Sequence, residues 1–89
     1  MINTYKAEYD QEWSRYFEPL DEGIKVRVAK KIGKILNYPI KRHLKKSLFF
    51  VDELGQYRVI YRVFDDDKIV RFYFAGTHKE YEKWYKRSF

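Results

Sequence analysis

The chain has 89 residues, a formal net charge of +6, two histidines and no cysteine. That length is enough for one domain, over residues 1–89, with one modest core, and is too short for two domains. The missing cysteines exclude disulfides and thiolate metal sites, and two isolated histidines do not make a ligand cluster, so we expect no metal and no cofactor. No signal-like apolar run and no uncharged stretch of ~20 residues is present, which predicts a cytoplasmic protein without a membrane segment.

The positive charge is concentrated in the middle of the chain. Between Gly23 and Val51 the sequence has basic residues but no Asp or Glu, so all 13 acidic residues lie outside this block. Such a surface fits a polyphosphate partner such as RNA, although basic runs also form ordinary solvated helix faces. The basic residues of the block are Lys25, Arg27, Lys30, Lys31, Lys34, Lys41, Arg42, Lys45 and Lys46.

The first half of the chain reads as one strand followed by two helices. In residues 2–9 apolar and polar side chains alternate in part, and Ile, Thr and Tyr are present, which predicts a strand. Asp10 then caps a short helix with apolar residues at helical spacing, and Pro19 separates that helix from the next. The second helix spans residues 21–36 and has an apolar stripe on one side. Its opposite side is basic, with Arg27, Lys31 and Lys34 in line and Lys30 alongside.

The second half reads as a meander that ends in a helix. Residues 47–53, 56–64 and 68–75 are rich in Val, Ile, Phe and Tyr and are separated by turn residues, which predicts three antiparallel strands. Residues 77–80 have the spacing of a capping box and open a last helix through about residue 87. The predicted class is α+β in the order β-α-α-β-β-β-α. We expect a small antiparallel sheet with two N-terminal helices and a short C-terminal helix packed on one face.

Two segments resemble a known family of proteins. Residues 44–62, L-K-K-S-L-F-F-V-D-E-L-G-Q-Y-R-V-I-Y-R, resemble the signature of the RelE/ParE toxin superfamily, and residues 74–81, F-A-G-T-H-K-E-Y, are similar to the C-terminal motif of its HigB branch. With the order of elements, the resemblance covers nearly the whole chain. It implies a RelE-like type II toxin, an endoribonuclease that cleaves mRNA in the ribosomal A site, inhibits translation and is neutralised by a RelB-like antitoxin.

The arginines of the meander suit metal-independent RNA cleavage. That reaction needs a base for the 2′-hydroxyl, an acid for the 5′ leaving oxygen and cations for the charge on the phosphorane. Arg58 and Arg62 lie an even number of residues apart on one strand and so share a face, and Arg71 on the next strand can join them. Each guanidinium can bind a phosphate with two hydrogen bonds, or can instead shield the strand or pair with the Asp residues at 65–67.

His78 and Tyr85 are the candidates on the last helix. The helix dipole in the first turn disfavours a protonated ring at His78, which suits a base. Tyr85 lies seven residues further along and therefore on the same side of the helix. In the RelE branch, the resemblance implies an Arg near the first position, where this chain has His78 and Lys79, and a Tyr near the second. The alternatives are an exposed helix-start residue for His78 and core or antitoxin-facing packing for Tyr85.

The chain departs from the superfamily on the first strand of the meander. RelE nucleases carry two lysines there, where this sequence has Phe49, Phe50 and Val51. The connector before the strand supplies replacements only if it folds over the site, and otherwise it belongs to the general basic face. The identity of the general base therefore stays open at this point. The connector residues concerned are His43, Lys45 and Lys46.

Further residues are candidates for binding RNA without taking part in the chemistry. Unpaired bases stack on exposed aromatic rings, and among the aromatic residues of the last two strands and the last helix we select Tyr57 and Tyr85 over Tyr61, Tyr73 and Trp84. The predicted RNA-binding residues are Lys31, Lys34, Arg42, Lys45, Lys46, Arg71, Lys79 and Tyr57.

Two other functions remain compatible with the sequence. ParE relatives poison DNA gyrase without nuclease activity, and they lack the basic and aromatic residues that this chain has on its last helix. A plain RNA-binding module would bind with an affinity that falls with salt and would leave RNA intact. For the nuclease we expect mRNA and the ribosome as partners, together with an acidic or amphipathic antitoxin that covers the basic surface.

Overall fold

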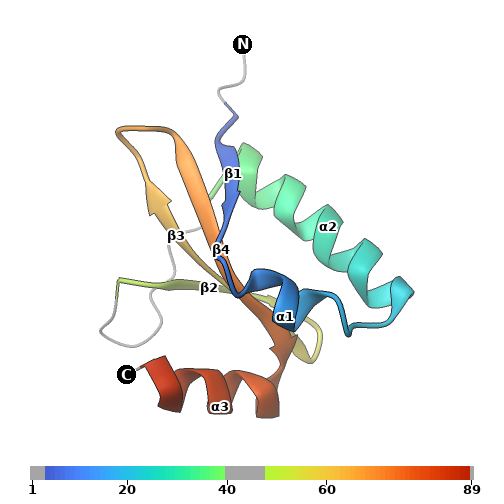
Figure 1. Cartoon of the computed structure of the whole chain (residues 1–89). Helices are drawn as coiled ribbons and strands as arrows, with labels where there is room; N and C mark the ends of the chain where they lie inside the picture. The colour runs from blue at the N-terminus through green and yellow to red at the C-terminus, as the bar shows by residue number, and fades with distance from the viewer. Residues whose placement is uncertain (1–3, 40–47, 89) are drawn as a thin grey trace.

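The computed structural model describes residues 4–39 and 48–88 of the chain. This part contains strands and helices in the order β-α-α-β-β-β-α, which confirms the predicted α+β class (Figure 1). The first strand is shorter than expected, and the other elements lie close to their predicted ranges. The elements are β1 (Lys6–Tyr9), α1 (Trp13–Phe17), α2 (Glu22–Asn37), β2 (Phe50–Leu54), β3 (Tyr57–Phe64), β4 (Ile69–Thr77) and α3 (His78–Ser88).

The strands form one sheet in the order β1-β4-β3-β2. The β2–β3 and β3–β4 pairs are antiparallel, which confirms the meander. β1 pairs with β4 in parallel, with Lys6 opposite Ile69 and Tyr9 opposite Phe72, so the sheet is mixed and the expected antiparallel arrangement is wrong for this strand. Local alternation identifies a strand but does not specify a distant partner or its direction.

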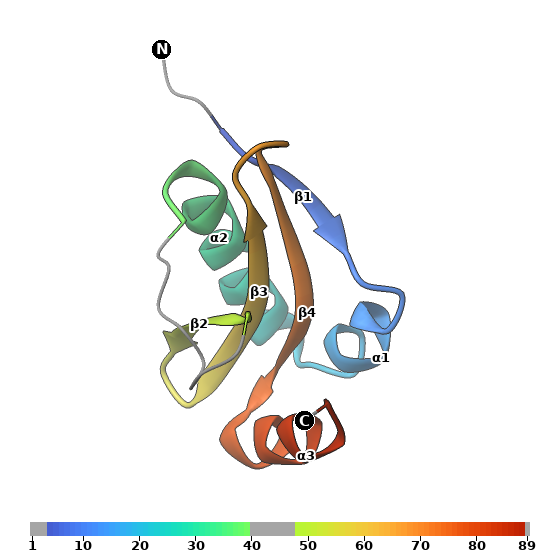
Figure 2. The same ribbon diagram turned by 90° about the vertical axis from the view of Figure 1, so that its left-hand side faces the viewer.

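Each face of the sheet carries its own apolar cluster. The α2-side cluster joins buried residues of α2 to β3 and β4, and the α3-side cluster joins buried residues of α3 to β2, β3 and β4. α3 lies across the end of the sheet where β4 finishes (Figure 2). The expectation that all helices cover one face is therefore wrong for α3. The buried residues are Trp13, Val28, Ile32, Ile35, Val59, Tyr61, Val70, Phe72 and Ala75 in the first cluster, and Val51, Ile60, Phe74, Tyr81 and Trp84 in the second.

A β-bulge in β4 explains how one strand supplies both clusters with aromatic rings. Ile60 pairs with Phe74 while its neighbour Tyr61 pairs with Phe72, so Tyr73 is an extra residue in β4. Strict alternation would put Phe72 and Phe74 on the same face. The bulge reverses the alternation, and Phe72 joins the α2-side cluster while Phe74 joins the α3-side cluster.

The predicted capping box forms at the start of α3. The Glu80 N–H donates to Oγ1 of Thr77 at 3.3 Å, and the Thr77 N–H donates to Oε1 of Glu80 at 2.9 Å. These bonds satisfy donors at the helix N-terminus and let β4 pass directly into α3. Gly55 lies in the turn between β2 and β3 and has φ of 62°, a conformation that favours glycine.

Candidate functional site

Arg58 of β3 and His78 of α3 meet at one end of the sheet. They line a cavity of about 330 Å³ together with Tyr81, Tyr85 and two charged residues of α3, Glu82 and Lys86. Both also line a neighbouring cavity of about 400 Å³, whose remaining walls are Gly55, Gln56, Thr77 and Lys79. We call these two cavities the Arg58–His78 site.

The strand register brings the two residues together. Arg58 lies opposite Gly76 in the β3–β4 ladder, and α3 begins with His78, two residues after Gly76. The capping box fixes the first turn of α3, and therefore the position of His78, relative to β4. The sequence predicted each residue separately, and the cross-strand pairing makes them neighbours.

The Arg58 side chain is held by two contacts. Its Nη1 lies 3.4 Å from Oε2 of Glu53 on the adjacent strand β2, and its guanidinium lies 5.1 Å from the ring centre of Tyr81. A carboxylate and an aromatic face together orient the planar group while leaving it partly exposed, at 25% for the side chain. Arg58 is therefore positioned to bind a phosphate that enters the site.

His78 makes a close contact with Glu82 one turn further along α3. Its Nε2 lies 2.8 Å from Oε1 of Glu82, so Nε2 donates the hydrogen to the carboxylate. The other ring nitrogen, Nδ1, is then the atom that can accept a proton in the neutral imidazole. The side chain is 55% exposed, which leaves the ring accessible to a ligand.

Tyr85 forms the far wall of the 330 Å³ cavity. It is half-buried, and its ring centre lies 6.1 Å from that of Tyr81. His78 packs against the other side of Tyr81, with the ring centres 5.7 Å apart. The three rings thus follow one side of α3, as the predicted helical spacing requires.

The structure places Arg62 and Arg71 away from this site. They lie opposite each other in the β3–β4 ladder, and Arg62 is four residues, or about 13 Å, along the strand from Arg58. The Arg62 guanidinium lies 4.9 Å from the ring centre of Phe64. The residues between Arg58 and Arg62 alternate between the two clusters, with Ile60 on the α3 side, which agrees with the prediction that the two arginines share a face. The two side chains line no common cavity among those described.

Arg71 is bound by carboxylates on and after β1. Its Nη1 donates to Glu8 at 3.1 Å and its Nη2 to Asp10 at 3.3 Å. Desolvation lowers the pKa of Arg71, but the hydrogen bonds to Glu8 and then Asp10 outweigh it and raise the pKa. These bonds link β1 to β4 at the edge of the sheet. The alternative that Arg71 pairs with acidic residues therefore holds, with partners other than the expected Asp residues at 65–67.

The predicted basic stripe of α2 is present and reaches toward the site. Four cations and Leu54 line a shallow cavity of about 180 Å³, and Nζ of Lys31 lies 3.7 Å from Oδ2 of Asp52. A methyl group placed on Gly55 would lie 3.3 Å from Nη2 of Arg27. Since Gly55 also lines the Arg58–His78 site, the basic surface continues around the β2–β3 turn. The cations are Arg27, Lys30, Lys31 and Lys34.

The remaining predicted RNA-binding residues fall in different places. Lys79 lines the 400 Å³ cavity. Tyr57 precedes Arg58 on β3 and so points to the opposite face, and Tyr61 is fully buried, which excludes it as a stacking surface. The connector candidates Arg42, His43, Lys45 and Lys46 lie outside the described residues.

The departure on the first meander strand is a packing feature. Val51 is buried in the α3-side cluster, where Phe49 also packs, and Phe50 packs against the α2-side cluster. The residues that sequence reasoning missed are Glu53, Tyr81 and Glu82, whereas Lys86 is one of the basic residues of the last helix that favoured a nuclease over a gyrase poison. Glu82 follows His78 at one helical turn, a spacing that would have revealed it.

Residues 4–39 and 48–88 hold no group of three or more His, Asp or Glu side chains placed to bind a metal ion. None of their helices has the length and hydropathy needed to span a bilayer.

The architecture defines the chain as a protein with the fold of the RelE toxins. It is similar to RelBE2 of Mycobacterium tuberculosis, a toxin–antitoxin complex (TM-score 0.75, 18% identity, 88% of this chain and 95% of the other). It is also similar to the isolated RelE toxin of E. coli (TM-score 0.72, 19% identity, 96% and 99%) and to the archaeal RelE–RelB complex of Pyrococcus horikoshii OT3 (TM-score 0.69, 22% identity, 83% and 94%). No protein-family model matches the sequence, and no curated protein matches it significantly.

Proposed function

We propose that this chain is the toxin of a type II toxin–antitoxin system and a metal-independent endoribonuclease that cleaves mRNA in the ribosomal A site. The observation that carries the proposal is the convergence of Arg58, His78 and Tyr85 on one open cavity, in a chain with the RelE fold. Cleavage would inhibit translation in the cytoplasm, where the ribosomes are.

The chemistry assigns a role to each of the three residues. Nδ1 of His78 takes the proton of a ribose 2′-hydroxyl, whose oxygen attacks the adjacent phosphorus. The guanidinium of Arg58 binds the phosphorane oxygens as their charge increases. The Tyr85 hydroxyl gives a proton to the departing 5′ oxygen, which leaves a 2′,3′-cyclic phosphate on one fragment and a 5′-hydroxyl on the other.

The openness of the site supports a dependence of cleavage on the ribosome. The His78 side chain is about half exposed and the cavities are shallow surface features at the end of the sheet, so this chain by itself orients a flexible RNA only weakly. Holding the reacting groups close together and correctly oriented accounts for a large share of the lowering of an activation barrier. A ribosome that holds the message in one conformation would supply that orientation, and Arg62 and the α2 cations would contact flanking phosphates.

An antitoxin is the expected protein partner. Several of the structures with this fold are toxin–antitoxin complexes, among them those of Mycobacterium tuberculosis and Pyrococcus horikoshii. A net charge of +6 favours an acidic or amphipathic partner. Binding of that partner over the Arg58–His78 site would block access of the message.

Primer extension on an mRNA, free and in programmed ribosomes, tests the proposal. The wild type should cut at the A-site codon. Arg58→Ala should reduce the single-turnover rate by about 10²–10³, as for loss of a charge-stabilising donor, and His78→Ala by about 10²–10⁴, as for loss of a general base. Lys83→Ala, an exposed cation on the same helix, is the matched control and should cut like the wild type.

Two results would contradict the proposal. An intact message in ribosomes, from a protein that still stops cell growth, would exclude the nuclease and direct attention to DNA gyrase, which a supercoiling assay checks. Message that is bound but not cut would leave an RNA-binding module. Cutting that survives both substitutions would keep the nuclease and overturn the assignment of Arg58 and His78.

A further inference from the structure

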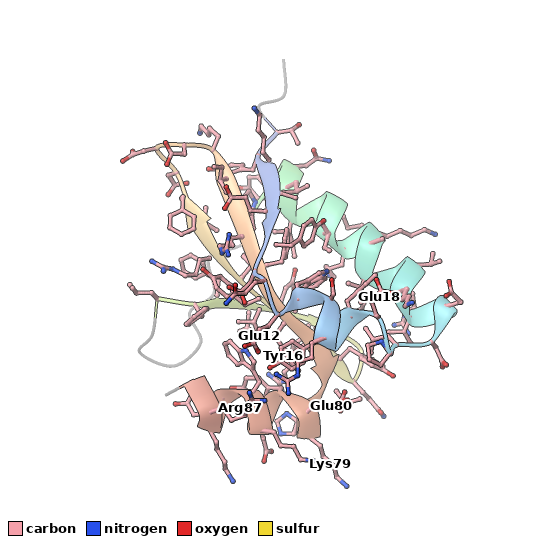
Figure 3. The ribbon with its side chains drawn as sticks, in the orientation of Figure 1. Glu12, Tyr16, Glu18, Lys79, Glu80 and Arg87 are labelled. Atoms are coloured by element: carbon pink, nitrogen blue, oxygen red, sulfur yellow. The ribbon has the colours of Figure 1, made fainter. Side chains whose placement is uncertain are left out.

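A separate cavity, of about 250 Å³, lies on the α3 face of the sheet and shares none of its described lining residues with the Arg58–His78 site. Figure 3 labels three residues of its lining: Glu12 directly before α1, Tyr16 of α1 and Arg87 of α3. Nothing in the proposed cleavage chemistry uses these residues. Its lining among the described residues is Asp10, Glu12, Tyr16, Phe49, Tyr73, Trp84 and Arg87.

Aromatic rings set at right angles form the walls of this cavity. Phe49 is perpendicular to Tyr73, with ring centres 4.9 Å apart and an interplanar angle of 89°. It is also perpendicular to Trp84, at 5.3 Å and 88°. Tyr16 completes the box from α1 and meets Phe74 edge-on at 5.0 Å. Such a cavity, slightly smaller than the ~300 Å³ at which drug-sized ligand sites begin, suits one planar ring system.

The bulge in β4 is what directs Tyr73 into the box. Tyr73 is the extra residue between the Ile60–Phe74 and Tyr61–Phe72 pairs, and it packs with the α3-side cluster. Bulges of this kind change the direction of a side chain at functional sites. The aromatic wall is therefore made by the same backbone feature that distributes Phe72 and Phe74 between the two clusters.

Among the charged residues that line the box, Arg87 is the cation open to a ligand. Asp10 receives a hydrogen bond from Arg71 at 3.3 Å, and Glu12 lies 3.6 Å from Arg15, so both carboxylates have a cation beside them. Arg87 is exposed and has no ion-pair partner among the described residues. The like charge of the Arg87 guanidinium would disfavour an ammonium group in the box, even though aromatic faces attract cations. An aromatic box with an available guanidinium matches a nucleotide.

We propose that this cavity binds one unpaired nucleobase of RNA between its aromatic walls, with Arg87 on the adjoining phosphate. The inference rests on the proposed function, because it makes the cavity a subsite for a nucleotide near the one that is cut. Stacking depends little on base identity, so the subsite holds the message in place more than it reads the sequence.

A non-cleavable RNA isolates binding from chemistry. The probe is a single-stranded hexanucleotide with 2′-O-methyl groups, which lacks the nucleophile. The chain has two tryptophans, of which Trp84 lines the cavity while Trp13 lies in the α2-side cluster. On addition of the probe, the NMR signal of the Trp84 indole N–H should shift and that of Trp13 should not.

Matched variants test the phosphate contact and the aromatic wall. Arg87→Gln should weaken binding about fivefold or more and lower the slope of log affinity against log salt by about 0.7 beyond what Lys83→Gln does. Lys83 has the same charge on the same helix and lines none of the cavities described above. Phe49→Leu keeps the wall apolar but removes a ring, and it should weaken binding about fivefold or more with the salt slope unchanged.

The outcomes separate this inference from the proposed function. A Trp84 signal that does not move, or equal effects of Arg87→Gln and Lys83→Gln, would overturn the subsite whether or not the protein cuts mRNA. A shift of Trp84 with an arginine-rich peptide and none with the hexanucleotide would also overturn it, in favour of a cationic partner. Probe binding that depends on Arg87 in a protein that never cuts mRNA would support the subsite and refute the nuclease.

Discussion

The capping box at the start of α3 supports both the fold and the site, and the effect of removing it can be calculated. Thr77→Ala deletes the Oγ1 atom that accepts from the Glu80 N–H at 3.3 Å and donates to the Glu80 carboxylate at 3.0 Å. Loss of a capping side chain costs about 1 kcal/mol of unfolding free energy, within a range of about 0.5–2. For a chain of this size, that lowers Tm by about 4–8 °C.

Thermal unfolding followed by circular dichroism measures the effect, and a double-mutant cycle identifies its origin. Thr77→Ala and Glu80→Ala remove the two ends of one set of hydrogen bonds, so the double variant should lose less than the sum, by at least about 0.5 kcal/mol. Lys83→Ala, exposed on the same helix, should stay within about 0.5 kcal/mol of the wild type. Additive losses, or a Thr77→Ala variant as stable as Lys83→Ala, would refute the reasoning.

Three further substitutions test the packing. Gly76→Ala should lower the unfolding free energy by about 1–3 kcal/mol, because the added Cβ would lie 2.8 Å from Cζ of Phe74 and 2.9 Å from Oε1 of Glu80. Gly33→Ala in α2 meets nothing within 4 Å and should raise the unfolding free energy by up to about 1 kcal/mol. Urea unfolding of the two variants should therefore give changes of opposite sign. Burial raises the pKa of Tyr61, so its stabilising effect is complete below the ordinary pKa near 10 and is lost as pH rises above it. Unfolding free energy should therefore fall less between pH 9 and 11 for Tyr61→Phe than for the wild type, and equal slopes would contradict a buried, neutral phenol.

Features that depend on short sequence spacings were predictable. The capping box is a four-residue pattern, and the cationic stripe of α2 is a helical one, and both are present. The hairpins follow from alternation and turn residues. The parallel pairing of β1 with β4 and the bulge at Tyr73 depend on contacts between distant residues, so local patterns do not contain them.

The same distinction separates the residues of the site. Tyr85 was placed beside His78 because both lie on one helix, and the structure agrees. Arg58 joins them because it pairs with Gly76, and Arg62 does not because strand geometry carries it about 13 Å away. A shared face was predictable, whereas the point on that face where α3 crosses depends on where β4 ends.

Under the proposed function, RNA binding and RNA cleavage depend on two different groups of charged residues. The α2 cations and the Arg58–His78 site both reach the β2–β3 turn, since Arg27 lies against Gly55 on one side and Gly55 lines the 400 Å³ cavity on the other. Lysines that contact phosphates supply affinity that is independent of sequence and falls with salt, whereas cleavage depends on a few oriented groups. Under the proposed function, neutralising Lys30 and Lys34 should weaken ribosome binding and leave the rate from the bound complex unchanged. Replacing Arg58 or His78 should instead lower the rate from the bound complex and leave ribosome binding unchanged. Each has a carboxylate neighbour, Glu53 or Glu82, and both pack against Tyr81, so they are oriented for a single phosphate.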